Sequence, residues 1–272
     1  MRDNNLRAFQ EAARVFCEAS CRVALTGAGI SVGSGIPDFR STGGLWSRFD
    51  PDQFATLEAF FRHPEKAWVF YRELGRVLTG RRPTAAHLAL ARLERAGLLD
   101  QILTQNIDGL HQAAGSASVS ELHGSFRRLQ CLACGRREPV RASHLDPGPI
   151  PRCNGCGAHL KPDVVLFGEE VREGEEAAEL VERCDLLLLI GTSSTVYPVA
   201  SYPRRVLRRG GCLLEFNLTD TEVSHLCRYR FPGGADQTVP GFVAAILAEQ
   251  EKVEPAPSRC SPPSEPGGDG SD

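Results

Sequence analysis

The chain has 272 residues, a formal net charge of −3 and a hydrophobic fraction of 42%. This length suits one large domain or a large domain with a smaller partner, and the near-neutral charge gives no general attraction to nucleic acid or anionic lipid. No apolar signal segment follows Met1 and no apolar run is long enough to span a membrane, so we expect a cytoplasmic protein without membrane contact, whose ten cysteines form no disulfide scaffold.

Apolar periodicity predicts strands that alternate with helices. A helix is expected over 4–19, a buried strand over 22–26 and a glycine-rich loop directly after it. Further strands are expected at 101–104, 119–122, 164–167, 186–190 and 212–216, and further helices at 64–78, 84–96, 171–183, 198–209 and 240–251. Pro83, Pro198 and Pro240 fit near helix starts. This alternation is typical of the α/β class with a doubly wound parallel sheet.

The segment 127–159 interrupts this rhythm with two cysteine pairs, Cys131-Leu-Ala-Cys134 and Cys153-Asn-Gly-Cys156, separated by 18 residues. This spacing is typical of a tetrahedral Cys₄ zinc site. Four thiolates fill the coordination shell of zinc and leave no open position, so we predict a structural metal in a small insertion. From Val253 onward, proline, serine, glycine and acidic residues dominate, which predicts a disordered tail.

Three loops at predicted strand ends indicate a nucleotide site. Gly27-Ala28-Gly29 places bare backbone where phosphate oxygens can approach amide groups, although Gly33 is one place late for the dinucleotide motif and a tight turn has the same signature. The segment 191–194 is a second small polar loop, and Asn217 ends a third strand, where its amide could bind ribose or adenine. Ligands of doubly wound sheets bind at the carboxyl ends of the strands.

Six short motifs follow one another in the chain: Gly27-Ala-Gly-Ile-Ser31, Gly35-Ile-Pro-Asp-Phe-Arg40, Thr104-Gln-Asn-Ile-Asp-Gly-Leu-His111, His123-Gly124, Lys161-Pro-Asp-Val-Val-Leu-Phe-Gly-Glu169 and Gly191-Thr-Ser193. With the Cys₄ spacing, this order resembles the sirtuins, NAD-dependent protein-lysine deacylases, from about residue 20 to about residue 245. The resemblance implies a Rossmann-like NAD-binding domain formed by 1–45, 98–126 and 160–252. It also implies a small helical and zinc-binding domain formed by 46–97 and 127–159, with a tail at 253–272.

The resemblance also implies the chemistry. The amide oxygen of an acyl-lysine displaces nicotinamide from NAD, a base draws a proton through the ribose hydroxyls, and nicotinamide and O-acyl-ADP-ribose are released. His123 matches the family's base, a role that suits a neutral imidazole. Asn106 and Asp108 match positions at the nicotinamide and its ribose. His111 closes the same motif and receives no chemical role.

Other positions match the family's cofactor contacts. Asp38, Phe39 and Arg40 match the flexible cofactor loop, in which Arg40 can pair with the pyrophosphate and Phe39 can exclude water. Trp46 lies in the same loop, with core packing as the alternative. The predicted cofactor contacts are Gly27, Ala28, Gly29, Ser31, Asp38, Phe39, Arg40, Trp46, Gln105, Asn106, Ile107, Asp108, Gly191, Thr192, Ser193 and Asn217.

For the substrate, the resemblance implies acyl-lysine proteins or peptides that add as an extra strand along 164–168. Val164 and Phe167 are expected to line the acyl-lysine tunnel, with Gly168, Glu169 and Tyr71 also in contact. Sirtuins that prefer succinyl or malonyl groups carry Tyr-x-x-Arg on a helix, whereas here Leu74 stands three residues after Tyr71. We therefore expect acetyl or another neutral acyl group.

Three alternatives remain open at this point: a desuccinylase or demalonylase, a protein mono-ADP-ribosyltransferase, and a zinc-ribbon protein that binds nucleic acid. The last would use the arginines beside the cysteines, Arg127, Arg128, Arg136 and Arg137. The net charge and the lack of interleaved aromatic residues argue against it, so no direct nucleic-acid contact is expected. The oligomeric state is left open.

Overall fold

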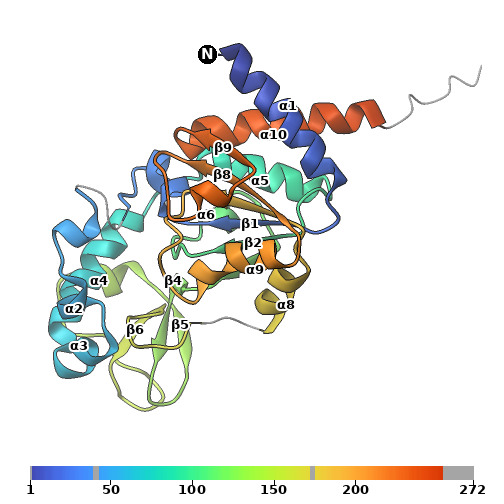
Figure 1. Cartoon of the computed structure of the whole chain (residues 1–272). Helices are drawn as coiled ribbons and strands as arrows, with labels where there is room; N and C mark the ends of the chain where they lie inside the picture. Colours follow the sequence, from blue (N-terminus) through green and yellow to red (C-terminus); the bar gives the residue numbers. More distant parts are fainter. Residues whose placement is uncertain (1, 39–42, 172–174, 254–272) are drawn as a thin grey trace, which may run out of the picture.

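The computed structural model describes residues 2–38, 43–171 and 175–253. Its larger body is built on a six-stranded parallel sheet in the order β3-β2-β1-β7-β8-β9 (Figure 1). The strands are β1 (Arg22–Thr26), β2 (Gln101–Thr104), β3 (Val119–Glu121), β7 (Leu186–Ile190), β8 (Cys212–Asn217) and β9 (Tyr229–Pro232). The strand order reverses beside β1, so the loops that follow β1 and β7 leave the sheet side by side.

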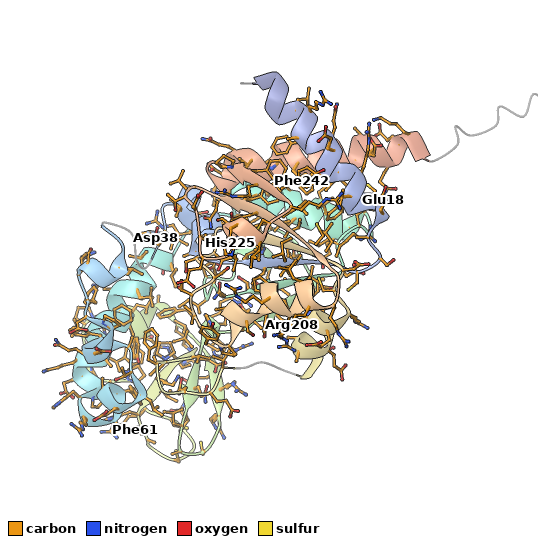
Figure 2. The ribbon with its side chains drawn as sticks, viewed as in Figure 1. Glu18, Asp38, Phe61, Arg208, His225 and Phe242 are labelled. Atoms are coloured by element: carbon orange, nitrogen blue, oxygen red, sulfur yellow. The ribbon has the colours of Figure 1, made fainter. Side chains whose placement is uncertain are left out.

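Helices cover both faces of this sheet. Successive side chains of its central strands point to opposite faces, and both faces are apolar. Val23 and Leu25 face α8 (Glu175–Arg183) and α9 (Tyr202–Arg208), whereas Ala24 faces the other layer. That layer is formed by α1 (Arg2–Glu18), α5 (Ala85–Arg95) and α10 (Ala235–Val253). Phe242 of α10, labelled in Figure 2, lies 5.1 Å from Phe216 of β8 and 5.8 Å from Phe16 of α1, measured between ring centroids. Burial of these rings joins the helices to the sheet.

A smaller lobe combines helices with an antiparallel sheet of three strands, in the order β5-β4-β6 (lower left in Figure 1). Its elements are α2 (Pro51–Phe54), α3 (Leu57–Arg62), α4 (Pro64–Leu78), β4 (Gly124–Cys131), β5 (Arg137–Pro139), α7 (Ala142–Leu145) and β6 (Leu160–Val164). Trp68 and Tyr71 of α4 pack against Leu129 and Leu160 in one core, and the Trp68 indole N–H donates to the Leu160 carbonyl over 2.8 Å. This core connects the helices to the two cysteine pairs.

The predicted fold class is confirmed, and three details differ from the sequence prediction. The strand expected at 164–167 ends at Val164, since Phe167 instead forms an isolated bridge with Thr56. Pro240 lies inside α10, which begins at Ala235. There the apolar face around Phe242 outweighs the hydrogen bond that proline cannot donate.

The third difference concerns α5, which the sequence analysis placed in the small domain within 46–97. Its buried face, which includes Ala86, Leu90 and Leu93, packs in the same core as α1, α10 and the large sheet. Residues 85–95 therefore belong to the layer that covers the sheet, and the rest of the predicted domain division stays a prediction. Across the described residues, no helix is both long and apolar enough to span a bilayer.

Candidate active site

The loops after β1 and β7 cross so closely that only glycine fits. The Gly27 N–H donates to the Ile190 carbonyl over 3.0 Å, and the Gly29 N–H donates to the Gly191 carbonyl over 2.9 Å. A Cβ atom on Gly29 would lie 2.6 Å from the Gly191 Cα, and Gly191 itself has a φ of +59°. Phosphate binding is the reason expected for Gly27 and Gly29. The crossing gives a second reason for glycine, because a Cβ atom has no room there. The crossing also places η1 (Ala28–Ser34) at the strand-order reversal, where such sheets bind nucleotides.

Three predicted residues meet beside this crossing. Asn106 follows β2, and its Nδ2 donates to the Gly27 carbonyl over 3.1 Å and to Ser31 Oγ over 3.2 Å. Ser31 Oγ donates to the Asp108 carboxylate over 2.7 Å, and the Leu110 N–H donates to the other carboxylate oxygen over 2.9 Å. Burial raises the pKa of Asp108, and these two hydrogen bonds act in the opposite direction. The side-chain amide of Asn106 uses its donors within the protein, so its oxygen remains to accept from a ligand.

His123 lies between β3 and β4 and is partly buried. Its Nδ1 is 3.1 Å from the Gln105 carbonyl oxygen. A carbonyl only accepts, so Nδ1 carries the proton and the neutral ring has its lone pair on Nε2. Gln105 is held in turn, because Thr192 Oγ1 donates to its Oε1 over 2.6 Å. The His123 carbonyl accepts from the Val165 N–H over 2.9 Å, which connects this histidine to the predicted substrate segment.

The remaining predicted cofactor residues are distributed around this centre. Asn217 Nδ2 donates to the Thr192 carbonyl over 2.8 Å, and the Ser193 and Thr195 hydroxyls lie 2.9 Å apart. Ile107 packs against the core of the small lobe and so joins the two bodies. Figure 2 places Asp38 on the segment that leads toward the small lobe. Phe39 and Arg40 lie outside the described residues, as does the tail from residue 254, and the side chain of Trp46 is likewise not described.

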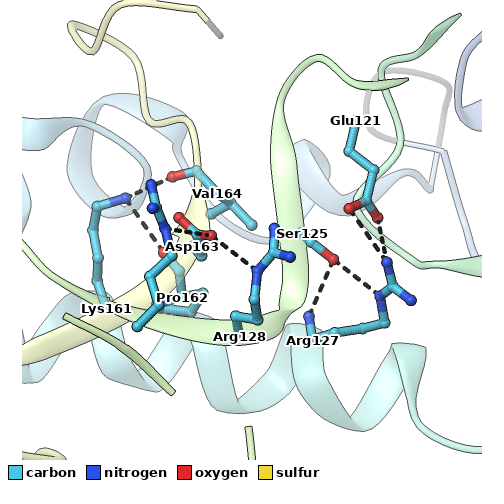
Figure 3. A network of polar contacts seen from close by, with 9 residues as sticks. Glu121, Ser125, Arg127, Arg128, Lys161, Pro162, Asp163 and Val164 are labelled. Atoms are coloured by element: carbon cyan, nitrogen blue, oxygen red, sulfur yellow. Dashed lines mark hydrogen bonds and ion pairs between the residues drawn. The ribbon is translucent and has the colours of Figure 1, made fainter. Parts of the chain in front are cut away.

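A buried lysine organises the predicted substrate segment. The Lys161 side chain is fully buried, and its ammonium donates to the Val164 carbonyl over 2.6 Å (Figure 3). It also donates to Glu169 Oε2 over 3.0 Å. The same carboxylate oxygen accepts from the Leu166 N–H over 2.8 Å. Gly168 has a φ of +88°, which turns the chain back toward Glu169.

Most N–H groups of the substrate segment already have partners inside the protein. The Val165 and Leu166 N–H groups donate as described above, and the Phe167 N–H donates to the Ala55 carbonyl over 2.9 Å. The Phe167 carbonyl accepts from the Leu57 N–H over 3.0 Å. Val165, Gly168 and Glu169 line a surface hollow beside Leu57. An added peptide strand therefore meets N–H groups at 165–167 that already have partners within the protein.

The arginines beside the cysteines pair with acidic residues. Arg128 and Arg137 each place Nε 3.2 Å from the carboxylate of Asp163, which is fully buried. Arg127 forks onto Glu121 over 3.2 and 3.3 Å and also donates to Ser125 Oγ (Figure 3). Two carboxylates therefore offset two of these three positive charges within the fold, which does not favour a phosphate-binding surface.

The four cysteines converge on one point, as zinc requires. Their Sγ atoms all lie within 4.8 Å of one another, with 3.5 Å between Cys131 and Cys156 and 3.6 Å between Cys134 and Cys153. Tetrahedral Zn–S bonds of about 2.3 Å place sulfurs about 3.8 Å apart. The Gly155 N–H donates to Cys153 Sγ over 3.4 Å, and this hydrogen bond helps to lower the pKa of the Cys153 thiol. The donor set thus fits a structural Zn²⁺, with no ligand position left for water.

Sequence reasoning assigned no role to several buried polar residues near the site. Lys161 lay inside a recognised motif, and Thr26 and Thr104 end two buried strands. His111 received no chemical role and His87 lies outside every recognised motif, yet both are buried. A polar residue at the last position of an apolar strand is a usable signal, because this edge of a parallel sheet faces the ligand.

Comparison with known proteins gives one consistent result. A family model described as "Sir2 family" matches residues 27–198. The chain is 39% identical to an NAD-dependent protein deacylase of Pyrococcus furiosus, over 87% of this chain and 97% of the relative. It is 45% identical to an NAD-dependent protein deacetylase of Caldivirga maquilingensis, over 78% of this chain and 84% of the relative. A solved complex of a Sir2 homologue with NAD superposes with a TM-score of 0.82 at 37% identity, covering 88% of this chain and 94% of that one.

Proposed function

Because this chain belongs to the Sir2 family and is an NAD-dependent protein deacylase with NAD and zinc as its cofactors, we propose that it prefers acetyl and other neutral acyl groups on lysine. The products are the deacylated protein, nicotinamide and O-acyl-ADP-ribose. The observation that carries the acyl preference is the position of Leu74 relative to Tyr71.

Tyr71 and Leu74 are three residues apart on α4 and so share one face of the helix. Both are buried in the core of the small lobe, and the Tyr71 hydroxyl has no hydrogen-bond partner among the described residues. Burial raises the pKa of Tyr71, and the Glu169 carboxylate raises it further. A succinyl carboxylate near Tyr71 would therefore approach Glu169 with no arginine at position 74 to offset its charge.

The two arginines nearest in sequence are engaged elsewhere. Arg72 donates to the Gly148 and Pro149 carbonyls over 2.8 and 3.1 Å, and its guanidinium lies over the Trp68 ring. Arg76 contacts Glu73 over 3.4 Å. Neither supplies the cation that an acidic acyl group needs, which supports acetyl or another neutral acyl group as the preferred substrate.

His123 is the proposed general base. NAD supplies the C1′ carbon of its nicotinamide ribose, where the amide oxygen of the acyl-lysine displaces nicotinamide. The chain's own task is then to position the reactants and to accept a proton from the ribose hydroxyls. The hydrogen bond from Nδ1 to the Gln105 carbonyl supports this role, because it orients the ring and leaves the Nε2 lone pair for the proton.

Asn106 and Asp108 are proposed to hold the nicotinamide end. The Asp108 carboxylate can stabilise the positive charge that develops on the ribose as nicotinamide leaves. Its two hydrogen bonds fix its orientation, and the Ser31 link ties it to the loop after β1. The roles of Arg40, Phe39 and Trp46 stay predictions of the family resemblance.

The cytoplasmic location also stays a prediction. Within the described residues no two cysteines are joined by a disulfide, which supports a reducing compartment. No direct nucleic-acid contact is proposed, since Arg127, Arg128 and Arg137 pair with carboxylates.

The test is NAD-dependent turnover of matched peptides that carry acetyl-, butyryl- or succinyl-lysine, followed by mass spectrometry. We expect acetyl-lysine to react faster than succinyl-lysine, with one nicotinamide and one O-acyl-ADP-ribose formed per lysine. His123→Ala should remain folded and lose activity by a factor of about 100 or more. A strong succinyl preference would overturn the acyl assignment, and a mass gain of ADP-ribose on the peptide or enzyme would indicate a transferase instead.

A further inference from the structure

A row of buried polar side chains runs behind the candidate site and ends at Asn106. His111 Nε2 lies 2.9 Å from Thr26 Oγ1, and Thr26 Oγ1 donates to Thr104 Oγ1 over 2.9 Å. Thr104 Oγ1 also accepts from the Asn106 backbone N–H over 3.1 Å. On its other side, the His111 ring is 4.7 Å from the His87 ring, measured between centroids. All five residues are buried.

The hydrogen positions in this row follow from the partners. Thr26 gives its single hydroxyl proton to Thr104, so it must accept from His111, and His111 carries its proton on Nε2. The Thr84 N–H donates to His87 Nδ1 over 3.2 Å, so His87 carries its proton on Nε2. His111 then donates to Thr26, and Thr26 donates to Thr104. Because the two hydrogen bonds run in the same direction, each strengthens the other.

Both imidazoles stay neutral at physiological pH. Burial lowers the pKa of His111 to about 4, and burial together with His111 lowers the pKa of His87 to about 3. A buried neutral imidazole keeps its proton on the same nitrogen. Adding a second proton, or moving the proton to the other nitrogen, costs much free energy in this environment. The row therefore holds one arrangement at the pH where the enzyme works.

We propose that His111 is a positioning residue for the nicotinamide end of the site, an inference that rests on the proposed role of Asn106. His111 orients the Thr26 hydroxyl, which orients Thr104, which anchors the Asn106 backbone. The Asn106 side chain is anchored separately by the Gly27 carbonyl and Ser31. With both anchors in place, the Asn106 amide oxygen faces the ligand in one orientation.

Three variants interrupt or preserve this row. His111→Leu removes the donor to Thr26, and Thr104→Val removes the hydroxyl that joins Thr26 to Asn106 while keeping the side-chain shape. His111→Gln retains an N–H close to the position of Nε2. We expect the first two to lower kcat/KM for NAD about tenfold and to weaken nicotinamide inhibition, with KM for the peptide unchanged. His111→Gln should recover most of the loss.

The matched control is His87→Leu. His87 is as deeply buried as His111 and packs against its ring, but its hydrogen bonds are made to Thr84 in the first turn of α5 and not to the row. Its replacement should lower the melting temperature and leave kcat/KM for NAD at 25 °C within about twofold of the wild type. A purely structural His111 would behave like this control. The inference is overturned if His111→Leu matches His87→Leu in kinetics, or if Thr104→Val leaves nicotinamide inhibition unchanged.

Calorimetric titration of each variant with NAD and with nicotinamide gives a readout that does not depend on turnover. If the wild type releases no nicotinamide, the proposed function is contradicted. The binding data would still test whether His111 positions Asn106. If the wild type turns over acyl-lysine peptide normally and all four variants bind NAD and nicotinamide as tightly as the wild type does, only the role of His111 is contradicted.

Discussion

The ammonium of Lys161 lies 3.0 Å from the carboxylate of Glu169, and the lysine side chain is fully buried. Lys161 also donates to the Val164 carbonyl, and Glu169 accepts from the Leu166 N–H. The pair therefore closes the turn that follows β6 and sets the path of the predicted substrate segment. Its position beside Tyr71 also connects it to the proposed acyl site.

Lys161→Met should destabilise the protein by about 3–5 kcal/mol, because it leaves the Glu169 carboxylate without its cation and the Val164 carbonyl without its donor. Urea unfolding measures the loss. The double variant Lys161→Met with Glu169→Gln should recover part of it, since the unpaired charge is gone. An equal loss in the single and double variants would show that the pairing itself is unimportant.

Leu74→Arg should shift the acyl preference toward succinyl-lysine. The new guanidinium would share the helix face of Tyr71 and offset the Glu169 charge, at a cost to the small-lobe core in which Leu74 is buried. We expect the ratio of succinyl to acetyl kcat/KM to rise about tenfold or more, as one charge-assisted hydrogen bond to a carboxylate provides. Arg76→Leu is the matched control for a change of charge on α4, and an unchanged ratio in Leu74→Arg would remove Tyr71 from the acyl site.

Cys131→Ser should release zinc and loosen the small lobe. Cys131 is buried in the same core as Trp68, so loss of the metal should change the near-ultraviolet circular dichroism and lower the melting temperature. Metal content by mass spectrometry should fall from about one zinc per chain to near zero. Cys212→Ser, a thiol outside the cluster, should keep its zinc. A zinc-free variant with unchanged spectrum and melting temperature would refute the structural role.

Stability should fall as the pH drops below about 6.5, because His87 and His111 are buried in the neutral form. Their folded pKa values are lowered from 6.5 to about 3 and about 4, so the unfolded chain takes up protons first. Stability from these groups is present above pH 6.5 and is lost as the pH falls through the window down to their folded pKa values. Two protons give a slope of about 2.7 kcal/mol per pH unit in that window.

Urea unfolding between pH 7 and pH 4.5 measures this slope. His87→Leu removes one of the two protons and should reduce the slope by about half. His63→Leu is the matched control for the replacement of a histidine, since His63 is exposed at the start of α4. Equal slopes in the wild type and His87→Leu would show that His87 does not contribute.

Much of the fold and site could be predicted because the signals are local. Five leucine and isoleucine residues in succession at 186–190 can only form a buried strand or a helix, and the flanking turns favour a strand. The paired cysteines carry the zinc geometry in their spacing. The glycines after β1 and the polar residue after β8 mark the ligand edge, since parallel strands all end on the same side of the sheet.

The amino-acid sequence by itself determined the alternation of strands and helices, the zinc cluster and the motif order that identifies the family, because each strand, cysteine pair and motif is a short local pattern. Only the tertiary structure decided that Gly29 must clear the Gly191 backbone, that α5 covers the large sheet, and that His111 reaches Asn106 through two threonines. The first and last of these contacts join segments that are 162 and 85 residues apart in the chain. Their distances arise from packing the whole sheet and its helices, which no local pattern of residues encodes.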